Sequence, residues 1–334
     1  MKVRSLHTLY LIGLLIVVIP LSGLTQDIHF SQFNQAPIRL NPALTGQFNG
    51  SYRIAGIFRS QWGSITVPYS TVAFSGDAQN FLKQEGLGVG IDFFYDKAGD
   101  GNLGTLQLNA SGSYTLKIGS TQKNQLTGGF QLGGARKQID PTYLVFTDQN
   151  GGGGTIENFE LGKSYINLST GLVWETKFEN RKILQAGVAI HNLTQPNVNL
   201  YANDEKRLDL RLSIHANYQF KMSQKVDLIP GLLIMLQGPH QQITPGINGK
   251  YILDNRSHHY RAVYLGLWTR VGDAGFISMG MDWNTLNVGL SYDINYSSLQ
   301  VASRYKGGFE VSLIYIFKES LPVRQFYKTC PDYL

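Results

Sequence analysis

The chain is poor in cysteine and in charge. Cys330 is its only cysteine, so no intrachain disulfide can stabilise the fold. Charged residues make up 16% of the 334 residues, whereas about 25% is usual in a soluble domain. The 29 Lys and Arg residues are scattered along the chain, which is not the pattern of a nucleic-acid-binding surface. The composition therefore excludes a disulfide scaffold and argues against a nucleic-acid partner.

Long apolar runs are also scarce. The run Leu9–Ile19 follows Lys2 and Arg4 and precedes small residues before Gln26, an order typical of a secretory signal peptide. We expect residues 1–25 to be removed on export; an uncleaved membrane anchor is the alternative. Beyond this leader, no run reaches the roughly 20 apolar residues that a transmembrane helix needs.

What the chain has instead is strict alternation of apolar and polar residues. Between Arg207 and Phe220, seven apolar side chains alternate with polar ones, which places the two sets on opposite faces of one strand. About fourteen such segments follow one another, at a spacing that suits tilted strands of about 9–11 residues. Hydrocarbon offers the backbone no hydrogen-bond partner, so strands span it only as a closed ring. The pattern predicts an all-β fold, a transmembrane antiparallel β-barrel of about 14 strands.

The strands are expected at particular segments, some clearer than others. The clearest are 87–95, 103–117, 126–135, 165–177, 183–191, 207–220, 242–253, 276–283, 286–294 and 309–317, and the less regular ones are 52–61, 69–76, 226–236 and 260–270. Residues 226–236 are apolar on both faces, and Pro230 and Pro245 each remove a ladder donor. A bulge or an inward kink would reconcile these places with a barrel. The alternative is a soluble β-sandwich or propeller, which would have to bury the apolar faces against a second sheet.

The alternation also predicts which side chains face the lumen. On segment 103–117, leucines such as Leu106 and Leu108 face lipid, and polar residues such as Gln107 and Asn109 face inward. Charged residues expected inward, where they neutralise one another, are Asp92, Asp209, Arg211, Asp282, Asp293 and Glu310. Aromatic residues expected at the membrane interfaces are Trp174, Tyr218, Phe220, Trp268, Trp283, Tyr315 and Phe317.

The connections differ in length on the two sides of the expected barrel. Short ones fall at 118–124, 178–181, 221–225, 254–259 and 284–285, and long ones at 136–164, 193–206 and 295–307. Short periplasmic turns and long external loops are typical of bacterial outer-membrane barrels. We therefore expect an N-terminal periplasmic or plug segment at 26–50, the barrel at 51–318 and a periplasmic tail at 319–334.

No motif predicts catalysis, a cofactor or a metal site. Gly151–Gly154 lacks the Lys and helix of a phosphate loop. Asp96–Asn102 lacks two ligands of a calcium loop, because Ala98 stands at one ligand position and Gln107 at another. His258 and its neighbour His259 lack further ligands at metal spacing.

An outer-membrane hydrolase is the enzymatic alternative. His191 and His215 are expected to face the lumen, where a histidine beside a serine could activate it as a nucleophile. Polar filling of the lumen is the commoner role of such residues. We expect no enzymatic activity.

Several short motifs together resemble one protein family. They are Gln26–Gln32 (QDIHFSQ), Asn41–Gly46 (NPALTG), Arg59–Trp62 (RSQW), Asp96–Gly99 (DKAG), Phe146–Gln149 (FTDQ), His191–Asn197 (HNLTQPN), Ser291–Asp293 (SYD) with Ser297, and Gly307–Leu313 (GGFEVSL). In this order they resemble the PorP/SprF family of the Bacteroidetes type IX secretion and gliding system. That family usually ends in a Cys-Pro-Arg-Phe-like tail, whereas here Asp332 follows Cys330 and Pro331.

The resemblance implies an outer-membrane barrel, similar to fatty-acid-transporter barrels, that supports secretion or surface attachment of cargo with C-terminal sorting domains. Its implied partners are type IX machinery proteins on the periplasmic side, a secreted cargo or adhesin, and outer-membrane lipid. The candidate partner-binding residues are His191, Asn192, Gln195, Pro196, Asn197, Asp148 and Gln149 in external loops, and Cys330 and Pro331 in the tail. The alternative is an outer-membrane transporter or porin for small or hydrophobic solutes.

Overall fold

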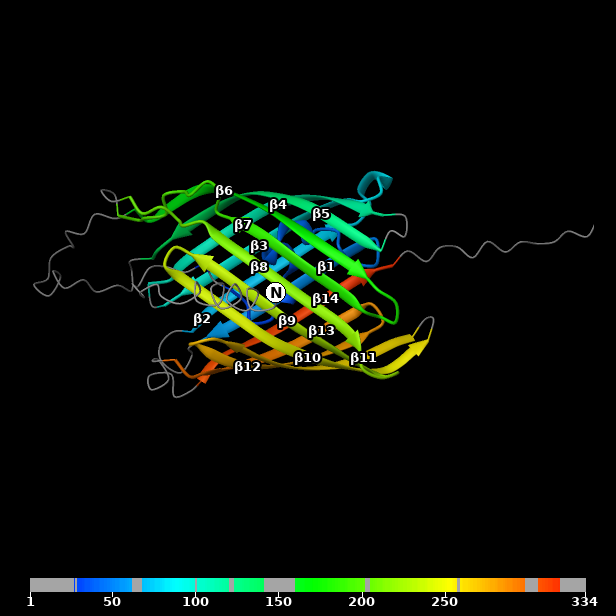
Figure 1. The fold of residues 1–334 in the computed structure, drawn as a ribbon. Helices are drawn as coiled ribbons and strands as arrows, with labels where there is room; N and C mark the ends of the chain where they lie inside the picture. The colour runs from blue at the N-terminus through cyan, green and yellow to red at the C-terminus, as the bar shows by residue number, and fades with distance from the viewer. Residues whose placement is uncertain are drawn as a thin grey trace, which may run out of the picture.

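The described part of the chain forms one closed antiparallel β-barrel (Figure 1). The structure is a computed structural model that describes residues 27, 29–61, 68–99, 101–119, 123–140, 160–201, 205–256, 259–297 and 306–318. Fourteen strands pair in chain order, and the first and last strands pair with each other to close the ring. The predicted all-β barrel of about 14 strands is confirmed.

The strands are long and tilted across the barrel wall (Figure 1). They are β1 (Tyr52–Gln61), β2 (Tyr69–Ala78), β3 (Leu87–Ala98), β4 (Leu103–Ile118), β5 (Asn124–Gln138), β6 (Gly162–Lys177), β7 (Ile183–His191), β8 (Arg211–Lys221), β9 (Val226–Gln237), β10 (His240–Arg256), β11 (His259–Arg270), β12 (Ala274–Trp283), β13 (Leu286–Asn295) and β14 (Lys306–Phe317). Each expected segment overlaps one of these strands. The wall therefore follows the alternation read from the sequence.

The predicted faces of β4 are present. Leu108 is 60% exposed on the outside of the barrel, whereas the next residue, Asn109, is 4% exposed and faces the lumen. The outer surface of the wall carries exposed leucine, isoleucine, valine and aromatic side chains on strands all round the ring. Such a surface matches hydrocarbon rather than water.

One predicted strand begins later than expected. β8 starts at Arg211 rather than Arg207, because Arg207 forms an isolated bridge with Asn197 and the Leu208 N–H donates to the Pro196 carbonyl at 2.9 Å. The prediction that Asp209 faces the lumen is wrong: its side chain is exposed in the connection before β8.

The two proline positions do not distort the wall. β9 and β10 pair without a register shift through Pro230 and Pro245. β8 and β9 keep one register on both sides of Pro230, with the ladder interrupted only near it. Of the two ways to fit these prolines into a barrel, a bulge is absent from the described ladders there; the register shifts of the described ladders lie at Ile252/Asp254 and Tyr292/Ile294.

The connections divide into two rims. The long-loop rim carries the connections after odd-numbered strands, including 139–161, 192–210 and 296–305. The short-turn rim carries the connections after even-numbered strands, the longest of which is 79–86, and both ends of the barrel. The difference in length that the sequence predicted is present.

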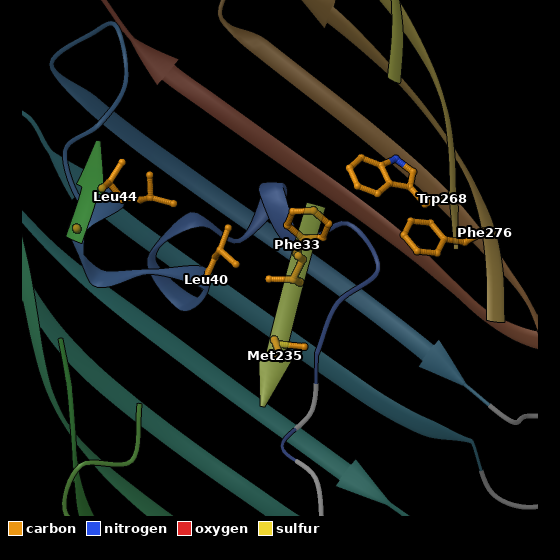
Figure 2. Close-up of a cluster of buried hydrophobic side chains, with 9 residues drawn as sticks. Phe33, Leu40, Leu44, Met235, Trp268 and Phe276 are labelled. Carbon is orange, nitrogen blue, oxygen red and sulfur yellow. The ribbon is translucent and has the colours of Figure 1, made fainter. Parts of the chain in front are cut away.

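The residues before β1 fill the lumen. We call Asp27 and residues 29–51 the plug segment; it contains η1 (Phe33–Gln35), α2 (Pro37–Leu40) and η2 (Pro42–Leu44) and lies inside the strands in Figures 1 and 2. At the long-loop rim, the Asp27 N–H donates to Gln237 Oε1 at 2.9 Å. At the short-turn rim, the Ser51 N–H donates to the Phe317 carbonyl at 2.8 Å. None of the helices in the described ranges has the length and apolar character to cross a membrane.

A charge placed on the outer face tests the contact with lipid. Leu108→Arg, near the middle of β4, is expected to lower the free energy of unfolding from a bilayer by about 2–4 kcal/mol. Leu82→Arg is the control, because Leu82 is 80% exposed in the connection between β2 and β3 and should change stability by less than about 0.5 kcal/mol. Urea unfolding of protein refolded into lipid vesicles measures both; equal losses would contradict the assigned outer face.

Candidate functional site: the plugged lumen

A buried group of ion pairs lies inside the wall near the long-loop rim. Arg59 on β1, which is 1% exposed, pairs with Glu310 Oε1 at 2.6 Å and with Asp293 Oδ2 at 3.1 Å. Arg270 on β11 approaches the same Asp293 oxygen at 3.5 Å. Two arginines thus balance two carboxylates in a place that water hardly reaches, and the expected neutralisation of Asp293 and Glu310 comes from these arginines.

The plug segment docks on these ion pairs through its backbone. The N–H groups of Ser31 and Gln32 donate to the two Glu310 oxygens at 2.6 and 2.8 Å. The Ser31 hydroxyl donates to Asp293 at 2.8 Å, and Arg59 Nη1 donates to the His29 carbonyl at 2.9 Å. Hydrogen bonds to ionised groups are about twice as strong as neutral ones. The two carboxylates therefore bind both the arginines and the plug segment.

His29 itself remains uncharged at neutral pH. Burial lowers the pKa of its imidazole, and the positive charges of Arg270 and Arg59 lower it further. Its two ring nitrogens have no hydrogen-bond partner among the described residues. The His29 ring therefore adds no third positive charge to the group of ion pairs around Arg59, which we call the docking site of the plug.

A second anchor lies at the middle of the plug. The fully buried Asn41 donates through Nδ2 to the carbonyls of Leu172 and Val188, at 3.1 and 3.2 Å. Two wall glycines make room for it: a Cβ added to Gly171 would lie 2.0 Å from Asn41 Oδ1, and one added to Gly187 would lie 2.9 Å from Asn41 Nδ2. The lack of side chains at these glycines of β6 and β7 thus leaves the space that the Asn41 amide occupies.

Two further ion pairs connect the plug to the wall. Near the short-turn rim, Arg53 pairs with Asp77 at 2.6 Å, and the two side chains also bind the Leu44 carbonyl and the Gly46 N–H. Toward the long-loop rim, the plug residue Arg39 pairs with Asp92 of β3 at 2.8 Å. The plug is therefore fixed at both ends and along its length.

The apolar part of the plug packs against an apolar part of the inner wall (Figure 2). Phe33 meets the Trp268 ring edge-on at 5.3 Å, and Trp268 stacks on Phe276 at 6.1 Å. Leu233 and Met235 of β9 face the same cluster, which explains why this strand is apolar on both faces. The prediction that Trp268 lies at the membrane interface is wrong: it is 7% exposed and faces the lumen, where the plug gives its ring an apolar partner.

The five predicted partner-binding residues in the described ranges lie near the plug or in the connection after β7. His191 is buried with Nε2 3.4 Å from the Leu40 carbonyl, and Asn192 donates to Asp27 Oδ2 at 2.9 Å. Gln195 is exposed, Pro196 is half-buried, and the Asn197 side chain accepts from backbone N–H groups of its own loop. Asp148, Gln149, Cys330 and Pro331 lie outside the described residues. Partner binding by all nine stays a prediction.

The two lumen histidines are occupied by the plug. His215 Nε2 lies 3.2 Å from Asn41 Nδ2, and His191 approaches a plug carbonyl. Within the described ranges no group of three or more His, Cys, Asp or Glu residues has the geometry of a metal site. Both histidines thus contact the plug segment.

Sequence reasoning missed the residues, in the plug and in the wall, that join the two. Ser31, Gln32 and Asn41 carry no periodicity that marks them as buried, and Arg59 was not among the charges expected inward. The available signal was positional: these residues fall within the short motifs Gln26–Gln32, Asn41–Gly46 and Arg59–Trp62. The structure brings Ser31, Gln32 and Arg59 together with Asp293 and Glu310, and it brings Asn41 to the carbonyls of Leu172 and Val188.

These features define the class: an outer-membrane β-barrel whose lumen is filled by its own N-terminal segment. The family model described as type IX secretion system membrane protein PorP/SprF matches residues 22–315. The chain therefore belongs to the PorP/SprF family. A search of the curated proteins found no match in sequence.

Solved outer-membrane channels have a similar fold. The toluene transporter TbuX of Ralstonia pickettii has a TM-score of 0.51 at 10% identity, covering 84% of this chain and 92% of that one. The Pseudomonas putida toluene transporter TodX has a TM-score of 0.46 at 8% identity, covering 84% and 93%. A Pseudomonas aeruginosa FadL homologue has a TM-score of 0.42 at 10% identity, covering 83% and 93%. The likeness to TbuX shows the fold alone.

Removing the central arginine tests the docking site. Arg59→Ala leaves two buried carboxylates without their closest cation, which is expected to cost about 3–5 kcal/mol and to loosen the plug. Chemical unfolding in detergent measures the loss, and conductance in planar bilayers reports the plug. Arg256→Ala is the control, because this exposed arginine pairs with Asp254 at the rim and should change neither reading. Unchanged stability of the Arg59 variant would contradict the role of the ion pairs.

Proposed function

We propose that this protein is an outer-membrane component of the type IX secretion machinery that supports secretion or surface attachment of cargo proteins with C-terminal sorting domains. Membership of the PorP/SprF family supports the link to this machinery. The observation that carries the proposal is the plug, which hydrogen bonds attach to the buried ion pairs between β1, β11, β13 and β14. A barrel with its lumen filled in this way is suited to holding partners at its rims.

The two rims offer surfaces to different partners. The short-turn rim, with short connections and both barrel ends, corresponds to the periplasmic side and carries Leu82 and Met222, which are 80% and 68% exposed. We assign contacts with periplasmic machinery proteins to this rim. The long-loop rim then faces the exterior, where Tyr201 is 50% exposed in the connection between β7 and β8. We assign contacts with cargo to that rim.

Loss of the protein should leave type IX cargo inside the cell envelope. In a strain lacking the gene, we expect at least one cargo with a sorting domain to disappear from the cell surface and to return when the wild-type gene is restored. Surface proteolysis and fractionation measure where the cargo lies. Tyr201→Ala should lower surface display of that cargo, whereas Tyr251→Ala, on the outer face of β10 with 44% exposure, should not.

The rival transporter function gives a different result. If every type IX cargo still reaches the surface of the deletion strain, the proposal fails. If the purified wild-type protein then also conducts ions or takes up a solute in planar bilayers, a transporter is favoured instead.

A further inference from the structure

Three cavities follow one another beside the plug, from the short-turn rim to the long-loop rim. The first, of about 360 Å³, includes Gln185 and Asn287 in its wall, near the short-turn ends of β7 and β13. The second, of about 340 Å³, includes Ala98 and Lys137, at the long-loop ends of β3 and β5. A third cavity of about 40 Å³, which we call the neck, lies where the plug meets β8 and β9.

The neck connects the two larger cavities. Phe33 and Leu40 of the plug line both the neck and the first cavity. Arg39 and Arg211 line both the neck and the second cavity. The neck itself has room for only a few water molecules. The three cavities therefore form one line of space through the filled lumen, and this line is narrowest at the neck.

Most of the neck is apolar, whereas the cavities on either side of it are polar. Phe33 and Leu40 line the neck from the plug, and Met235 of β9 belongs to the same lining (Figure 2). Leu233 of β9 lines it as well and is 1% exposed. Amide side chains such as Asn217 line the first cavity, and charged side chains line the second. Because a narrow apolar constriction excludes water and ions, the neck closes the line.

The charges along this line favour anions. Of the described residues, the charged ones that line the neck are Arg39 and Arg211, whose side chains are 17% and 14% exposed. Their partners Asp92 and Asp27, at 2.8 and 3.5 Å, line the second cavity instead. The first cavity is lined by one charged residue among those described, Arg53. An ion in the neck therefore lies nearer to guanidinium groups than to carboxylates, as in an anion-selective pore.

We propose that this line of cavities is a gated pathway for small monovalent anions that runs beside the plug. The gate is the apolar contact at the neck between Phe33 and Leu40 of the plug and Leu233 and Met235 of β9. Opening requires these side chains to move apart, and it does not require the plug to leave the lumen. The pathway is a function in addition to the one proposed above and does not depend on it.

Current through planar bilayers in potassium chloride tests the proposal, with protein purified from the outer membrane. The wild type is expected to stay closed. Leu233→Ala and Met235→Ala each remove apolar atoms from the gate, and each should raise the current at least about tenfold. In a gradient of potassium chloride, the reversal potential of the open variants should show that chloride passes at least about three times as readily as potassium. Thermal unfolding in detergent verifies that each variant folds.

Two controls assign the current to the neck. Val173→Ala also shortens a buried side chain of the apolar cluster around the plug, but Val173 does not line the neck, so this variant should stay closed. Arg211→Gln, added to Met235→Ala, removes one charge of the neck and should lower the preference for chloride. Arg256→Gln, added to Met235→Ala instead, removes an exposed charge at the short-turn rim and should leave that preference unchanged.

Four results would overturn the proposal. They are folded neck variants that stay closed, a wild type that conducts as well as they do, equal currents through the Val173 and Leu233 variants, and open variants without a preference for chloride. The last result would mean that the ions do not pass the two arginines. None of these results depends on cargo display, so the failure of this inference and the failure of the proposed function are distinguishable.

Discussion

The structure depends on the inability of hydrocarbon to hydrogen-bond a peptide group. Strands in a bilayer must form a ring, and here the ladder between β1 and β14 runs from Tyr52 opposite Phe317 to Gln61 opposite Gly308. A ring of about eight strands can be filled by its own side chains, whereas a wider one leaves a lumen. Fourteen strands therefore need something more than wall side chains to close them. The plug segment fills that space, and buried carboxylates of the inner wall such as Asp77, Asp293 and Glu310 accept hydrogen bonds from it.

Charge determines where the plug sits more than how stable the barrel is. A buried ion pair gains little net free energy over apolar packing, but it is costly to break by removing one partner. The charged groups of Arg59, Asp293 and Glu310 accordingly fix the position of the plug backbone at Ser31 and Gln32. At the middle of the plug, Gly171 and Gly187 leave space for Asn41 and so add a steric condition. Together these contacts make wall and plug one body, whose rims are the parts left for partners.

The strands of the wall could be predicted from the sequence, whereas the contacts that hold the plug could not. Alternation reports which face a side chain takes on its own strand, so β1 and β7 were predicted with their observed bounds. It does not report what the inner face will contact, and Trp268 was assigned to the membrane interface because only the plug reveals its partner. It also does not distinguish a strand from an extended connection, which is why Asp209 was placed in the lumen. The ion pair of Arg59 with Glu310 joins residues 251 positions apart, a distance over which local patterns carry no information.

The central claim is that the plug stays in the lumen while the protein works. Thr45 in the plug and Ser111 on β4 lie with their hydroxyl oxygens 2.9 Å apart, so we expect cysteines at these two positions to form a disulfide. The decisive measurement is cargo display in cells that carry Thr45→Cys and Ser111→Cys, with the native Cys330 replaced by Ser. The account predicts that the disulfide forms in the outer membrane and that cargo reaches the surface as in the wild type. A disulfide that does not form, or one that abolishes display, would contradict it.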